Sequence, residues 1–131
     1  MTRAELTRRV ETIEETYEFF LAYAAQGASG DRESKSGGQL RDYLERMTDA
    51  LTGLAEGFRA VIAEERGDLA AYEAFLEVLA RDAGNTLAAL RVVTAQPSIG
   101  SQMIDNLNAS IHVRALLTDL FLLDEAARPV S

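Results

Sequence analysis

A helical repeat in the middle of the chain limits the folds that this sequence can adopt. Between residues 40 and 61 the apolar side chains are spaced alternately four and three residues apart, which places them on one stripe of a helix. They are Leu40, Leu44, Met47, Leu51, Leu54, Phe58 and Val61. A half-buried strand would instead need an apolar residue at every second position, and no such run extends beyond a few residues. The pattern therefore predicts an all-α chain.

The same spacing recurs in three other blocks, separated by breaks that contain glycine, serine or proline. Thr2 and Glu5 have the spacing of a capping box at the start of the first block. Similar helix lengths and short turns favour an up-down-up-down antiparallel four-helix bundle with long helices. A chain of 131 residues suits a single domain, residues 1–131. The expected helices cover about residues 3–26, 38–66, 69–95 and 98–127.

The breaks between the blocks carry different signals. Residues 27–38 read GASGDRESKSGG, a composition that predicts a mobile surface loop. Gly67 and Asp68 predict a much shorter turn, in which the glycine ends one helix and the aspartate caps the next. In the last block the apolar stripe changes phase near residues 109–113, as a local unwinding of the helix would produce.

Several apolar side chains lie outside the stripes that a bundle needs for its core. Phe19 and Tyr23 are the surplus residues of the first helix, and Leu117, Phe121 and Leu122 are those of the last. Surplus apolar area on a helix is typical of an interface between subunits or with a partner. We therefore expect these five residues to form a docking surface, and we expect a homodimer or a complex with a partner protein.

The single histidine of the chain lies where the stripe of the last helix changes phase. Asn108 precedes His112 by one helical turn, and Asp105 precedes it by one heptad. A histidine near a carboxylate can bind a metal ion or titrate near neutral pH. These three polar residues are the candidates for a small-ligand or metal site inside the bundle.

Other sites known in helical bundles do not fit the sequence. A di-iron bundle needs two Glu-x-x-His pairs, whereas Ala109 stands three residues before His112. Phosphotransfer bundles usually carry lysine and glycine three and four residues after their histidine, and here those positions are Ala115 and Leu116. The chain has no cysteine, so thiolate chemistry and cysteine-bound metals are excluded. We expect no cofactor and no catalytic activity.

The negative charge of the chain indicates which classes of partner are not expected. The formal net charge is −8, whereas nucleic acids and anionic membranes require a basic surface, so neither is an expected partner. The chain shows no apolar signal segment and no uncharged run of about 18 apolar residues, which predicts a soluble, cytoplasmic protein. Lys35 is the only lysine among 13 basic residues, a bias that we interpret as typical of a bacterial genome.

These observations favour a non-catalytic accessory, scaffold or chaperone-like protein that acts through an apolar helix surface, as a homodimer. The alternative is a small-ligand or metal-binding bundle that uses the polar groups near His112. A third hypothesis is a subunit that supplies structure to an enzyme while its partner performs the chemistry.

Overall fold

The computed structural model describes residues 1–32 and 34–129, and every regular element in these ranges is a helix. A short 3₁₀ helix, η1 (Leu69–Ala71), separates the third and fourth α-helices. The all-α prediction is confirmed, but the described ranges contain six α-helices where four were expected. In chain order these are α1 (Arg3–Ala25), α2 (Gly37–Leu51), α3 (Leu54–Glu65), α4 (Glu73–Thr94), α5 (Ser101–Ala109) and α6 (Ile111–Ala126).

The start of α1 is fixed by the predicted capping box. The hydroxyl oxygen of Thr2 accepts a hydrogen bond from the backbone N–H of Glu5 at 3.2 Å. The backbone N–H of Thr2 in turn donates to the Glu5 carboxylate at 3.4 Å. Two N–H groups that a helix start leaves without partners are satisfied in this way.

The helix predicted over residues 38–66 is divided into α2 and α3. Gly53 has a φ of +73°, a left-handed conformation that glycine adopts without a steric penalty. Arg9 of α1 donates to the backbone carbonyls of Asp49 and Thr52, at 3.1 and 2.6 Å, and so satisfies groups that the break exposes. The apolar spacing continues across the interruption, which is why the sequence pattern predicted one continuous helix.

The last helix is also divided, at the place where its apolar stripe changes phase. Ser110 has an extended backbone, with ψ at 152°, and ends α5. Its hydroxyl oxygen accepts a hydrogen bond from the N–H of Val113 at 3.4 Å and so caps the start of α6. The predicted local unwinding near residues 109–113 is therefore an interruption between two helices.

The helix predicted from residue 69 begins later, at Glu73, after the 3₁₀ turn. Asp68 was expected to cap it, but its side chain makes no cap hydrogen bond. The Asp68 carboxylate instead accepts two hydrogen bonds from the Arg66 guanidinium, both at 3.1 Å. Gly67 has the positive φ expected of a residue that follows a helix end, here +75°.

The described part of the loop predicted at residues 27–38, which excludes residue 33, makes hydrogen bonds to other segments of the chain. Asp31 is buried, and its carboxylate accepts hydrogen bonds from Arg41 Nε at 2.8 Å and from the N–H of Ile99 at 2.6 Å. Arg41 also donates to backbone carbonyls at the end of α4 and just after it. A buried charge needs such partners, and here they join the loop to two other segments.

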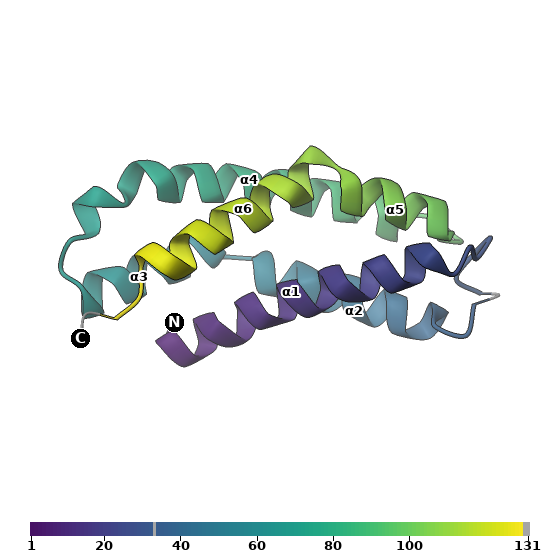
Figure 1. Cartoon of the computed structure of the whole chain (residues 1–131), viewed down its shortest axis with the longest axis horizontal. Helices are drawn as coiled ribbons and strands as arrows, with labels where there is room; N and C mark the ends of the chain where they lie inside the picture. The colour runs from purple at the N-terminus through teal and green to yellow at the C-terminus, as the bar shows by residue number, and fades with distance from the viewer. Residues whose placement is uncertain (33, 130–131) are drawn as a thin grey trace.

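The helices run roughly along one long axis of the molecule (Figure 1). Helix α1 packs against α2, α3 and α5, while α6 packs against α4 and α5. Helices α1 and α6 are not among the pairs in extensive contact. All six α-helices contribute to one apolar core, whose residues include Ile13, Phe20, Leu44, Met47, Ile62, Leu79, Ile104 and Leu116. Over the two described ranges, no helix is both long and apolar enough to cross a membrane.

Candidate functional site

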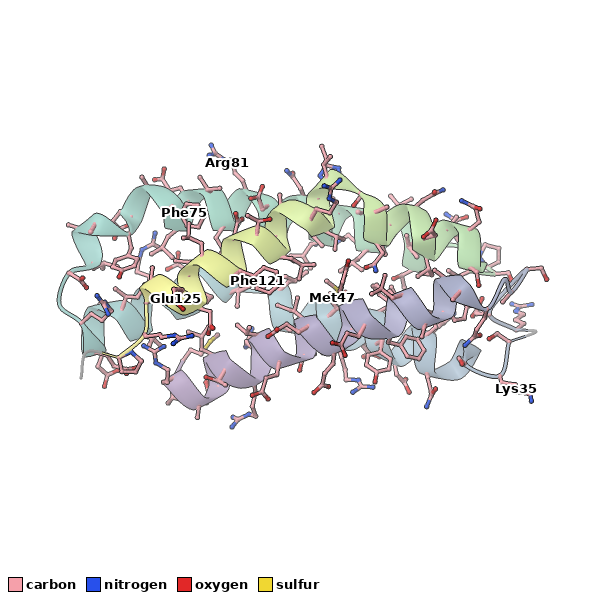
Figure 2. The ribbon with its side chains drawn as sticks, in the orientation of Figure 1. Lys35, Met47, Phe75, Arg81, Phe121 and Glu125 are labelled. Atoms are coloured by element: carbon pink, nitrogen blue, oxygen red, sulfur yellow. The ribbon has the colours of Figure 1, made fainter. Side chains whose placement is uncertain are left out.

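A groove lies between α1 and α6, which are not in extensive contact with each other. Two adjoining hollows, which share Glu14, make up its length. Phe121 of α6 lies at its edge (Figure 2). Phe121 is 62% exposed, and Leu21 of α1, which also lines the groove, is 50% exposed. The groove thus presents apolar surface to water. Its other apolar lining residues, from α1, α3 and α6, are Leu6, Val10, Tyr17, Phe58, Leu117 and Leu123.

The rim of the groove is acidic. No ion pair found in residues 1–32 and 34–129 uses any of its four carboxylates. Burial, followed by repulsion from the other three, raises the pKa of Glu14 above its ordinary value. Arg3 lies at one end of the groove, but its guanidinium is bound to Glu65 and to the carbonyl of Ala127. The four rim carboxylates belong to Glu11, Glu14, Glu18 and Asp124.

Three of the five predicted interface residues lie on α6, and two of these line the groove. Phe121 is exposed at its edge, and Leu117 is buried in its floor. Leu122 is 53% exposed but does not line either hollow. The apolar surplus on the last helix therefore corresponds partly to accessible surface.

The two predicted interface residues on α1 are engaged within the chain. Phe19 is half-buried and stacks on Tyr43 of α2, with 4.3 Å between ring centroids. Tyr23 is fully buried, and its hydroxyl donates a hydrogen bond to the carbonyl of Ile99 at 2.7 Å. The expectation that Tyr23 contacts a partner is wrong, because the segment before α5 covers it. Leu21, which the sequence analysis did not select, is the exposed large apolar residue on this part of α1.

The three predicted ligand residues face different neighbours. Asn108 is buried, and its Nδ2 donates to a carbonyl of α1 at 3.4 Å. His112 is half-buried, and its backbone carbonyl accepts from the Thr86 hydroxyl of α4 at 3.1 Å. Asp105 is exposed. The interruption at Ser110 removes the regular spacing that would have placed Asn108 and His112 on one face. Among the residues that the structure describes, no three histidine or carboxylate side chains are arranged to hold a metal ion.

A pair of carboxyl groups that the sequence analysis missed lies between α4 and α6. Asp119 is only 5% exposed, and its neighbouring carboxyl group is that of Asp82 on α4. An ionised carboxylate has no proton to donate, so two carboxyl groups can share a hydrogen bond only when one of them is protonated. Burial first, and then the hydrogen bond and charge of Asp82, raise the pKa of Asp119 to about 7. Its Oδ2 atom is buried and has no hydrogen-bond partner in the described part of the chain.

The position of Asp119 in the sequence did contain a signal. It comes three residues after Leu116 and four residues before Leu123, and both leucines are buried. Residues at these spacings lie on one face of a helix. An aspartate between two core positions is therefore a candidate for a buried carboxyl group.

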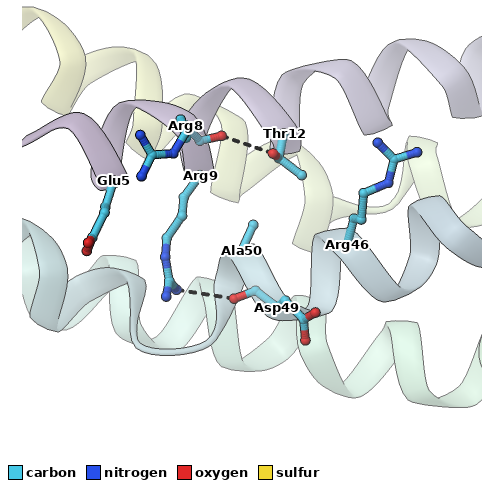
Figure 3. Close-up of a pocket in the computed structure, with 7 residues that line it drawn as sticks. All are labelled: Glu5, Arg8, Arg9, Thr12, Arg46, Asp49 and Ala50. Carbon is cyan, nitrogen blue, oxygen red and sulfur yellow. Dashed lines mark hydrogen bonds between the residues drawn. The ribbon is translucent and has the colours of Figure 1, made fainter. Parts of the chain in front are cut away.

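A second hollow, between α1 and α2, contains three arginines (Figure 3). The guanidinium of Arg9 already donates hydrogen bonds to the carbonyls at the end of α2. The guanidinium of Arg46 lies over the ring of Tyr43, 4.2 Å from its centroid. Two carboxylates share the hollow, so its positive charge is largely balanced. Its lining consists of Glu5, Arg8, Arg9, Thr12, Arg46, Asp49 and Ala50.

No family model matches the chain, and no curated protein or solved structure matches it either. The functional conclusion therefore depends on the geometry of these sites. The groove between α1 and α6 is the one that combines accessible apolar surface with unpaired charges.

Proposed function

We propose that the chain is a non-catalytic accessory or scaffold protein that holds an amphipathic helix of a partner in the groove between α1 and α6. The observation that carries this proposal is the apolar lining of the groove, which remains open to water at Phe121 and Leu21. An amphipathic helix buries its apolar face in such a groove, and the gain comes from removing apolar area from water.

The dimensions of the groove suit a helix of moderate length. Its apolar lining extends along α1 from Leu6 to Leu21, which corresponds to roughly 22 Å at the rise of an α-helix. A partner helix of about four turns would cover that length. Short amphipathic segments of this kind form when their apolar face finds a complementary surface.

The same groove fits an interpretation of the fold as an interrupted four-helix bundle. In this interpretation α2 with α3, and α5 with α6, each form one rod, and α1 and α4 are the other two. Helix α1 packs on α5 but not extensively on α6, so the seam between the first and fourth rods is closed at one end only. A partner helix would complete the open part of that seam.

A second copy of the chain is the less favoured occupant. A two-fold symmetric dimer through this face would bring the same surface of both copies together. The acidic rim of one copy would then face the acidic rim of the other, and like charges oppose such a contact.

Binding of a designed peptide tests the proposal. The probe is a fluorescein-labelled amphipathic peptide of about 18 residues, or five turns, with a leucine stripe and lysines beside it. We expect Leu21→Ser combined with Phe121→Ser to weaken its binding at least about tenfold, because two exposed apolar contacts are lost.

The matched control is Val92→Ser combined with Ile111→Ser, since these residues are 63% and 73% exposed and line neither hollow of the groove. We expect the control protein to bind the peptide as the wild type does, and circular dichroism checks that both variants are folded. Equal weakening by the two double variants, or no binding to the wild type, would contradict the proposal.

A further inference from the structure

We infer that the groove selects a partner helix with lysine or arginine residues along both edges of its apolar face, an inference that rests on the proposed function. The acidic groups stand on both sides of the apolar lining, with three on α1 and one on α6. A helix with a basic residue on each edge would therefore meet a carboxylate on each side.

The spacing of the rim carboxylates matches the geometry of a helix. Glu11, Glu14 and Glu18 follow one another at intervals of three and four residues, so they form a row along one side of α1. The row is about 10 Å long at the helical rise. Basic residues at the same intervals on a partner helix that runs beside α1 would lie opposite all three.

Within residues 1–32 and 34–129 these carboxylates form no ion pair, although the chain has 13 basic residues. The ion pairs of the described ranges instead use Asp31, Glu56, Glu65, Asp68, Glu73 and Glu125. Burial, and after it repulsion from the other three rim carboxylates, raises the pKa of Glu14. A cation beside Glu14 would offset that repulsion, and an acidic partner would increase it.

Ionic strength separates the proposed partner from a second copy of the chain. Salt screens attraction between a basic helix and the acidic rim, so binding should weaken as salt rises. Salt also screens repulsion between two acidic rims, so dimerisation through the groove should strengthen as salt rises. The two occupants therefore respond to salt in opposite directions.

The experiment compares three labelled peptides that share one leucine face and differ only in its flanks, which carry lysine, glutamine or glutamate. Fluorescence anisotropy measures their dissociation constants with the full-length protein at about 0.05 M and about 0.5 M NaCl. At low salt we expect the lysine peptide to bind about tenfold more tightly than the glutamine peptide. The glutamate peptide should bind most weakly, and high salt should reduce the difference.

Two double variants assign the preference to the groove. Glu14→Gln with Glu18→Gln keeps the shape of the rim and removes two charges. We expect it to reduce the preference for lysine to about threefold or less, because half of the rim charge remains. Glu15→Gln with Asp42→Asn removes two exposed charges outside the groove lining, and we expect it to leave the preference unchanged.

The outcomes distinguish this inference from the proposed function. Equal binding of the lysine and glutamine peptides, lost in the Leu21 and Phe121 double variant, would overturn the basic-partner inference and leave the groove as a docking site. Failure of all three peptides would overturn both. A molecular mass that doubles with rising salt in sedimentation would assign the groove to a second copy and overturn the inference.

Discussion

Replacement of Asp119 by asparagine tests whether the buried carboxyl pair controls the pH dependence of stability. The pKa of Asp119 is raised from 3.8 to about 7 in the folded chain. The folded state therefore holds this proton more tightly than the unfolded state. Asp119 contributes most to stability below about pH 4. This contribution is lost as pH rises from about 4 to about 7, and the loss is complete above that range.

The expected change in the free energy of unfolding follows from the difference between the pKa values of Asp119 in the folded and unfolded states. A change from 3.8 to about 7 corresponds to about 4 kcal/mol if Asp119 alone carried the whole effect. Sharing of the proton with Asp82 and local relaxation reduce the value, so we expect the wild type to lose about 2 kcal/mol between pH 4 and pH 8.

The Asp119→Asn variant has no such loss, because an amide stays neutral and its Nδ2–H can donate to the Asp82 carboxylate. We expect the variant to be about 2 kcal/mol more stable than the wild type at pH 8 and nearly equal to it at pH 4. Urea unfolding followed by far-ultraviolet circular dichroism, at intervals across this pH range, measures both values.

Asp105→Asn is the control, since Asp105 is an exposed aspartate on α5. We expect its stability to follow the wild-type curve at every pH. The reasoning about the carboxyl pair would be refuted if the Asp119→Asn curve ran parallel to the wild-type curve. A constant offset of that kind would mean that no proton is shared between α4 and α6.

Three further substitutions test the contacts that hold the helices together. Asp31→Asn should cost about 2 kcal/mol at pH 7, measured by urea unfolding, because the buried carboxylate accepts from Arg41 and from a backbone N–H. The hydrogen bond from Arg41 lowers the pKa of Asp31. The stability that the Asp31 carboxylate provides is therefore present above pH 4 and lost at lower pH. This loss at low pH should be absent in the Asp31→Asn variant. Gly53→Ala should lower the free energy of unfolding by about 1 kcal/mol, because alanine is strained at the positive φ of this position. Steric contact adds nothing, since a Cβ there would have no neighbouring atom within 4 Å. An unchanged melting temperature would argue against the left-handed conformation at residue 53. Arg9→Met should cost about 1 kcal/mol, and hydrogen exchange should show the end of α2 opening more often because the carbonyls of Asp49 and Thr52 lose a cationic donor.

Local patterns predicted the parts of the fold that depend on neighbouring residues. The capping box at Thr2 and the change of phase near Ser110 both involve groups within one helical turn of each other. Phe121 was recognised as surplus because its position on the helix is fixed by sequence spacing alone. The break at Gly53 left the apolar stripe intact, so periodicity carried no trace of it.

Contacts between distant segments could not be predicted in the same way. Tyr23 is buried, and its hydroxyl donates a hydrogen bond to the carbonyl of Ile99, which lies 76 residues further along the chain. Asp31 is anchored by Arg41 and by that same segment, and the glycine- and serine-rich sequence around it contains no sign of these contacts. Asp119 faces Asp82 only because of how α6 is aligned with α4. In each case the deciding neighbour depends on the relative placement of helices.

The interruption at Ser110 lets α5 and α6 pack mainly against different helices, whereas a continuous helix would follow one straight course. Helix α5 stays attached to α1, whereas α6 rests on α4 and forms one wall of the groove. The direction of α6 is therefore set by its packing on α4 and not by the course of α5. If the groove holds a partner helix, as we propose, substitutions in the contact between α4 and α6 would change the width of the groove and leave the junction of α1 and α5 intact.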